Sequence, residues 1–134
     1  MAVDKPRSLL LILARELATN VATPMFVVDV RGALVFYNEA AELLLGQSFS
    51  VTGPVGPDEW GGAMFQMEDL DGNRITVNDL PLAKTLTERR PAHARFRITA
   101  LDGVKRTLAA TSFPLFARAD DFAGTLSVFW EDEG

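Results

Sequence analysis

Residues 24–44 constrain the fold more than any other part of this 134-residue chain. Residues 25–30 and 33–37 are rich in β-branched and aromatic side chains, a composition typical of strands. Arg31-Gly32 between them is a turn signal, so the two runs predict a hairpin. Asn38 follows directly and can cap a helix by accepting a hydrogen bond from a free backbone N–H. The helix that it opens is expected to end at Gly46.

The rest of the chain predicts a second helix and three further strands. Residues 47–62 carry prolines and repeated glycines, which favours a long irregular loop with one turn at residues 58–60. Residues 63–68 read as a short strand or an extended segment. Asp79 is expected to cap a helix that closes near Arg89. Strands are then expected over residues 94–99, 104–115 and 124–130, with Asp102-Gly103 as a hairpin signal.

The chain also begins with a helix pattern, which Ser8 is expected to cap. Its apolar band is wider than one stripe, so more than one surface is needed to cover it. The elements together predict an α+β domain, with one antiparallel sheet and helices on its faces. We place the N-terminal helix in residues 1–21 and the sheet domain in residues 22–132.

Composition excludes several functional classes. The formal net charge of −5 argues against nucleic acid and against anionic membranes as partners. The absence of cysteine excludes disulfides, thiolate metal sites and sulfur nucleophiles. No apolar run approaches the roughly 20 residues that span a bilayer, so we expect a cytoplasmic protein without membrane insertion. We see no nucleophile–base pair, metal cluster or phosphate loop, and therefore expect no enzymatic activity.

Three segments resemble the PAS family of sensor and interaction domains. Residues 36–41, Phe-Tyr-Asn-Glu-Ala-Ala, resemble its junction between a strand and the first core helix. Residues 101–103 with 107–109 are similar to its central hairpin, and residues 124–131 to its last strand. An acidic residue followed by Ile or Val and Thr often ends that strand in the family, where this chain has Glu131-Asp132. The resemblance covers residues 22–132.

The resemblance implies a five-stranded antiparallel sheet whose inner face and core helices enclose a ligand cavity. It also implies an N-terminal helix that covers the outer face and builds a dimer. By the family pattern Phe129 faces the cavity. The expected pocket residues are Phe36, Leu44, Leu86, Phe96, Ile98, Phe113 and Phe129. The expected dimer residues are Leu10, Leu13, Leu17, Val21, Leu126, Val128 and Trp130.

Two functional hypotheses follow. The first is a non-enzymatic PAS signalling module that forms a homodimer or pairs with another signalling protein. The start at Met1 favours a stand-alone protein over a piece of a larger sensor. The alternative is a PAS sensor that binds haem, flavin or a small apolar ligand in the core pocket. The same pocket residues would also fill an ordinary hydrophobic core, and we expect no cofactor and no metal.

Individual residues leave some of these alternatives open. His93, the only histidine, could ligate haem, although it follows the preceding helix and lies at a strand edge. Non-covalent flavin could stack on Trp60, whereas adduct chemistry needs a cysteine that this chain lacks. Residues 69–73 imitate a calcium loop but lack its later glycine and glutamate, so a polar turn is expected. Four cations on neighbouring strands, Arg95, Arg97, Lys105 and Arg106, could meet an acidic ligand or form a solvated face.

Overall fold

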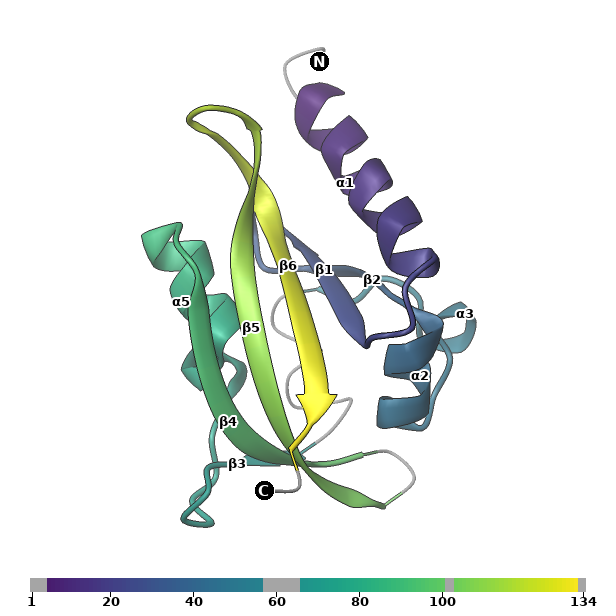
Figure 1. Cartoon of the computed structure of the whole chain (residues 1–134), viewed down its shortest axis with the longest axis vertical. Coiled ribbons are helices and arrows are strands. Elements are labelled where there is room, and N and C mark those ends of the chain that lie inside the picture. Colours follow the sequence, from purple (N-terminus) through teal and green to yellow (C-terminus); the bar gives the residue numbers. More distant parts are fainter. Residues whose placement is uncertain (1–4, 57–65, 101–102, 133–134) are drawn as a thin grey trace.

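A single antiparallel sheet organises the chain (Figure 1). The computed structural model describes residues 5–56, 66–100 and 103–132. The sheet has six strands in the order β2-β1-β6-β5-β4-β3. The strands are β1 (Met25–Asp29), β2 (Leu34–Tyr37), β3 (Gln66–Glu68), β4 (Ala92–Thr99), β5 (Lys105–Arg118) and β6 (Asp121–Glu131). The helices are α1 (Lys5–Thr19), α2 (Glu39–Leu45), α3 (Phe49–Thr52) and α5 (Pro81–Glu88), with a 3-10 turn, η2 (Val77–Asp79).

The predicted α+β class is confirmed, with one more strand than expected. The sixth strand is β3, which pairs with only the last three residues of β4, Arg97 to Thr99. Residues 66–68 of the expected short strand are therefore a strand, whereas residues 63–65 lie outside the described ones. No helix in the described part of the chain is long and apolar enough to cross a membrane.

Helices cover the two faces of the sheet separately, as expected. The inner face packs against α2, against α5 and against Leu80 just before α5. On the outer face, α1 lies along the side of the sheet formed by β1 and β6 (Figure 1). Ala14 and Ala18 of α1 are buried there against Val27 and Leu126. Small side chains let this helix approach the sheet closely, and Leu11 packs against the same cluster.

The predicted boundaries of α2 are confirmed. Asn38 has extended backbone angles, and its side-chain oxygen accepts a hydrogen bond from the backbone N–H of Ala41. Gly46 ends the helix in the left-handed conformation at φ 80°, a region that glycine enters without steric cost. The pattern of an asparagine cap and a terminal glycine is therefore read correctly from the sequence.

Three other predicted boundaries are wrong. Helix α1 begins at Lys5, so Ser8 is inside it rather than at its cap. Asp79 does not cap α5, because that helix begins at Pro81 and Leu80 is its N-cap. The Asp79 carboxylate instead accepts a hydrogen bond from the backbone N–H of Thr76 at 2.9 Å. The expected irregular loop contains the short helix α3. The turn predicted at residues 58–60, with Trp60, lies outside the described residues.

Candidate functional site

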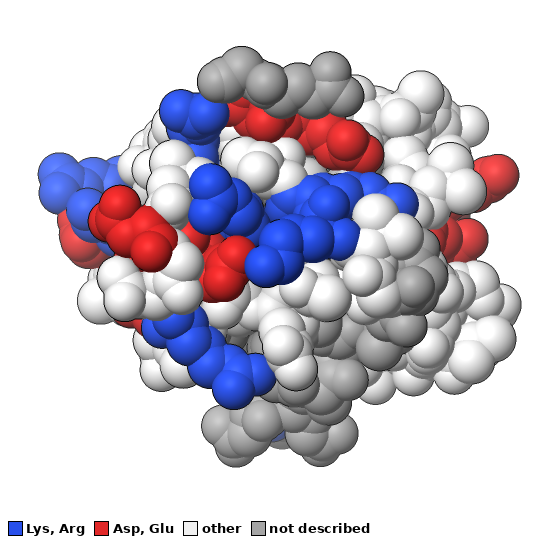
Figure 2. Space-filling model, turned by 90° about the horizontal axis from the view of Figure 1, so that it is seen from below, with Lys and Arg blue, Asp and Glu red and all other residues white. Residues whose placement is uncertain are grey.

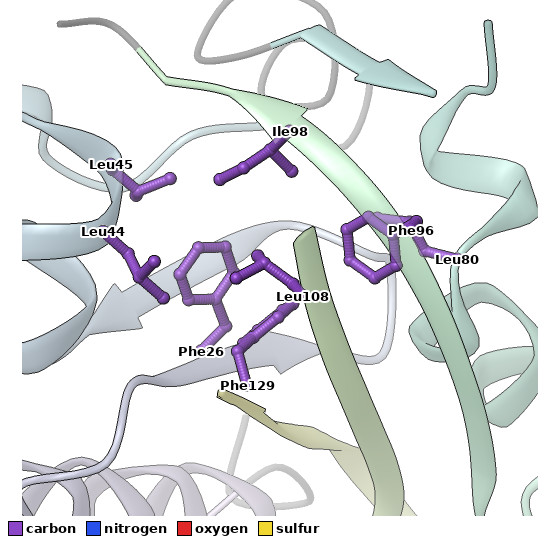
Figure 3. Close-up of a pocket in the computed structure, with 8 residues that line it drawn as sticks. All are labelled: Phe26, Leu44, Leu45, Leu80, Phe96, Ile98, Leu108 and Phe129. Atoms are coloured by element: carbon purple, nitrogen blue, oxygen red, sulfur yellow. The ribbon is translucent and has the colours of Figure 1, made fainter. Parts of the chain in front are cut away.

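The inner face holds a small apolar cavity between the sheet and its helices (Figure 3). Side chains from β1, α2, β4, β5 and β6 converge on it, together with the residue that precedes α5. The lining residues are Phe26, Leu44, Leu45, Leu80, Phe96, Ile98, Leu108 and Phe129. All of them are apolar, so the cavity offers a ligand no hydrogen-bonding group from these side chains.

Aromatic rings fill most of the space. The Phe26 and Phe129 rings are 4.8 Å apart, and Phe96 meets Phe129 edge to face at 6.4 Å. The remaining cavity is about 10 Å³. A single water molecule needs about 10–15 Å³, and pockets for drug-sized ligands have roughly 300–1,000 Å³. A haem or a flavin therefore does not fit unless the core opens.

Four of the predicted pocket residues, Leu44, Phe96, Ile98 and Phe129, surround this cavity. Leu86 packs against the same core cluster without lining the cavity. Phe36 and Phe113 lie on the opposite face of the sheet, in the cluster beneath α1. These two residues therefore cannot line the inner cavity.

The cross-strand register explains both misplacements. Phe36 pairs with Val27, and Val27 pairs with Leu126 across the next strand. Leu126 in turn pairs with Phe113. Directly paired residues point to the same side of a sheet, so all four of these side chains lie on the outer face. Phe36 also follows a bulge: Val27 pairs with Phe36 but Val28 pairs with Leu34. The extra residue reverses the alternation that the sequence pattern assumes.

The remaining lining residues are Phe26, Leu45, Leu80 and Leu108, which the sequence interpretation missed. A signal was available for Leu108, because an antiparallel hairpin places it opposite Phe96. Phe26 alternates with Val27 along β1 and so belongs to the inner set. Leu80 carried no such signal, since its place depends on where α5 begins.

Arg106 lies at the inner side of the sheet rather than with Lys105. Its side chain is 18% exposed; Nη1 donates to the Leu44 carbonyl oxygen at 3.0 Å, and Nε lies 3.3 Å from Glu131. A cation at the last turn of α2 is favourable, because the carbonyl end of a helix carries partial negative charge. Arg106 thereby joins α2 to the end of β6. The other three predicted cations, Arg95, Arg97 and Lys105, share the outer face. On the face of the molecule seen from below, Lys and Arg side chains lie beside Asp and Glu side chains (Figure 2).

Tyr37 fixes the segment that follows α2. Its hydroxyl donates to the Gln47 carbonyl oxygen at 3.0 Å and lies 2.9 Å from Thr52 Oγ1. Burial raises the pKa of Tyr37, while the bond to Thr52 opposes that rise and the negative charge of Glu42 adds to it. Phe49 of α3 packs edge-on against Tyr37 at 5.2 Å. The phenol therefore stays neutral and holds α3 against the core.

His93 lies on the outer side of β4, away from the cavity. It is exposed, its Nδ1 is 2.9 Å from Thr111 Oγ1, and its ring is 5.8 Å from the Trp130 ring. A haem in the inner cavity is therefore out of its reach. Sequence spacing did not predict the contact with Thr111, which arises because the two residues are cross-strand partners. The pair lies on the outer sheet surface, and His93 also lines a groove between the start of β4 and α5.

The segment that imitates a calcium loop is a turn closed by Asp69. The carboxylate accepts from the backbone N–H groups of Asp71 and Asn73, each at 2.9 Å. Hydrogen bonding by the Asn73 backbone is the main reason why the pKa of Asp69 lies below its usual value. Within residues 5–56, 66–100 and 103–132, no three His, Asp or Glu side chains gather into a metal site.

The outer face of α1 is the second candidate site. Four large apolar side chains of this helix are more than half exposed: Leu9 at 57%, Ile12 at 56%, Leu13 at 55% and Leu17 at 57%. Among the predicted dimer residues, Leu10, Val21 and Val128 are half-buried and Trp130 is 42% exposed. Leu126 is buried beneath α1 and is not available to a partner, because the helix of the same chain already covers it.

Several solved PAS domains share this architecture. The PAS domain of Bordetella pertussis BvgS matches over 92% of this chain and 86% of its own, with 16% identity and a TM-score of 0.60. The PAS domain of nitrogen regulation protein NR(II) from Vibrio parahaemolyticus matches over 90% and 98%, with 17% identity and a TM-score of 0.59. The Rhodobacter sphaeroides LOV protein matches over 95% and 68%, with 14% identity and a TM-score of 0.67.

No family model matches the chain, and no curated protein matches it in sequence. The class defined by the sheet order, the inner-face helices and these structural matches is nevertheless clear. The chain has the PAS fold. The resemblance found in its three sequence segments is thus confirmed at the level of the fold.

Proposed function

We propose that this chain is a PAS signalling module that assembles as a homodimer through α1. The observation that carries the proposal is the exposed row of Leu9, Ile12, Leu13 and Leu17. Single exposed apolar residues are common, but a contiguous group of large ones marks an interaction surface. The small residues of α1 already face its own sheet, so intramolecular packing leaves this row uncovered.

A two-fold dimer suits such a row because each copy presents the same apolar surface to the other. Spacings of three and four residues place Leu9, Leu13 and Leu17 on one side of the helix, with Ile12 beside them. Within this proposal the module acts through assembly and not through catalysis. Binding of a small apolar molecule in the core is the second role, and it requires the cavity to enlarge.

Light scattering at micromolar concentration tests the assembly. The wild type should have the mass of a dimer, and Leu13→Asp or Leu17→Asp should give a folded monomer, because a buried carboxylate in the interface is costly. Leu43→Asp is the matched control. Leu43 is 76% exposed on α2, so its substitution introduces the same charge away from α1 and should leave the dimer intact. A monomeric wild type would refute the proposal.

Native mass spectrometry of the same samples separates the two roles. A dimer with no added mass supports assembly alone. Added mass that is lost on substitution of a cavity residue supports the ligand-binding role.

A further inference from the structure

Helix α1 covers only part of the outer face of the sheet. It packs on β1, β2 and β6 and on the part of β5 around Phe113, where Leu11 joins its cluster. In Figure 1, β4 and the lower part of β5 lie away from α1. The next outward-facing residues along β5 and β6 are Thr111, which pairs with Val128, and then Trp130. Trp130 is 42% exposed and the other two are half-buried, so this part of the face is open in the single chain.

The apolar side of α1 is turned toward this open part of the sheet. The Arg15 guanidinium lies 4.9 Å from the centre of the Phe36 ring, so the Arg15 side of the helix faces β2. Successive residues of an α-helix are about 100° apart, and Leu10, Leu13 and Leu17 therefore project from the opposite side. That side faces β5, because β2 lies at one edge of the sheet and β5 lies beyond β6.

Helix and sheet thus form an apolar shelf with a wall and a floor. The wall is Leu10, Leu13 and Leu17, and the floor is Thr111, Val128 and Trp130. Polar groups border the floor on β4, where Arg95 is paired with Asp132 at 2.6 Å and His93 is 2.9 Å from Thr111. Since these border groups already have partners within the chain, the shelf favours an apolar occupant over a charged one.

The exposed row of α1 is too small to hold a dimer by itself. Its four side chains are each a little over half exposed and offer roughly 400 Å² of apolar surface, about half of the roughly 800 Å² that a stable interface buries on each partner. The floor of the shelf continues directly from α1 and adds an aromatic residue to this surface.

The width of the floor fits one helix. From β6 to β4 the sheet spans two strand spacings, about 10 Å in all, and an α-helix with its side chains is about 10–12 Å across. The occupant that suits the shelf is therefore a single apolar helix. The chain itself supplies such a helix, because the row of α1 needs cover of the same chemistry.

We propose that the shelf receives α1 of a second copy of this chain, so that the two helices lie side by side between two sheets. This inference rests on the proposed homodimer and assigns the sheet surface that completes it. Two-fold symmetry places each α1 on the floor of the partner, so one arrangement covers both exposed surfaces. Trp130 is then the central aromatic anchor of the interface, the kind of residue that carries most of the binding energy in protein complexes.

Trp130→Glu tests the floor in a dilution series measured by light scattering. The variant should raise the dissociation constant of the dimer at least tenfold, because it removes the aromatic anchor and places a carboxylate beneath the helix of the partner. Phe116→Glu is the matched control: Phe116 is also a partly exposed aromatic residue, at 38%, but it packs against Phe122 away from the shelf. This control should dimerise as the wild type does.

The outcomes separate this inference from the homodimer on which it rests. If Leu13→Asp is monomeric but Trp130→Glu dimerises with wild-type affinity, the α1 dimer stands and the assignment of the floor is overturned. A monomeric wild type would overturn both.

A cross-link in an otherwise intact dimer gives a second test, which does not require Trp130→Glu to fold. The chain has no cysteine, so a single introduced thiol can react only with a thiol of another copy. Leu13→Cys chains are mixed with Val128→Cys chains of a different tag and treated with a short bis-maleimide. The two kinds of chain should become linked, whereas Leu43→Cys, 76% exposed on α2, should not link to Val128→Cys. Equal yields from the two mixtures, or no link between Leu13→Cys and Val128→Cys, would overturn the proposal.

Discussion

The side-chain amide of Asn38 donates to the carbonyl oxygen of Ala18 at 3.0 Å and so ties the start of α2 to the end of α1. The same nitrogen also donates to the carbonyl oxygens of Val21 and Thr23, at 3.2 and 2.8 Å. The side-chain oxygen accepts from the backbone N–H groups of Met25 and Ala41. One buried side chain thus forms hydrogen bonds with backbone groups at the start of α2, in the connection after α1 and at the first residue of β1.

Asn38→Asp should destabilise the fold more than loss of a helix cap alone. Aspartate keeps the oxygen that caps α2 but replaces the donor nitrogen, so an acceptor faces three carbonyl oxygens. We expect a loss of about 3 kcal/mol in the free energy of unfolding, against about 1 kcal/mol for an ordinary cap. Urea denaturation measures it. A loss of 1 kcal/mol or less would mean that the bonds from Asn38 to the end of α1 and the segment after it add nothing to the stability of the fold.

Asn38 also shows what the sequence could predict. Its role as a cap follows from its position between a strand and an apolar helix, and the terminal Gly46 follows from the same local pattern. Its bonds to Ala18 and Val21 are long-range, and no local pattern contains them. Local chemistry thus predicts how an element begins and ends, but not which distant element it contacts.

The pocket prediction misplaced Phe36 and Phe113 for a similar reason. Strand alternation separates Phe129 from Leu126 correctly, and the structure places them on inner and outer faces. It does not reveal the bulge beside Val28, which sends Phe36 to the outer face. Nor does it show that small residues of α1 cover Leu126. Both facts depend on how strands and helices meet in space.

Tyr37 should make stability depend on alkaline pH. Its pKa in the folded protein is raised, so the folded state favours the neutral phenol more than the unfolded state does. This contribution is fully present below the ordinary pKa of about 10 and is lost as the pH rises through the folded value. Tyr37 is the only tyrosine, so tyrosinate absorbance reports this group alone. The native titration should lie above that of the urea-unfolded chain; coincident curves would contradict the burial effect.

Thr125→Val should stabilise the protein. The Thr125 hydroxyl is buried and has no hydrogen-bond partner in the described structure. Replacing a buried polar group that lacks a partner with an apolar group of the same shape should raise the free energy of unfolding by about 1 kcal/mol. Urea denaturation measures this change. Thr85→Val is the matched control, because the buried Thr85 hydroxyl donates to the Ser112 carbonyl oxygen at 3.3 Å and its loss should destabilise. An equal loss of the free energy of unfolding in both variants would show that the Thr125 hydroxyl has a hydrogen-bond partner.

Phe96→Ala should cost about 3–5 kcal/mol in the free energy of unfolding, because Phe96 is 2% exposed and lines the inner cavity. Phe116→Ala is the matched control, since Phe116 is 38% exposed and its loss should cost far less. The truncation should also create an apolar cavity large enough for benzene, as enlarged apolar cavities bind it. Benzene should therefore raise the melting temperature of Phe96→Ala and leave that of the wild type unchanged. An equal rise in both proteins would mean that the native core already opens to ligands, and would favour the sensor role over a filled core.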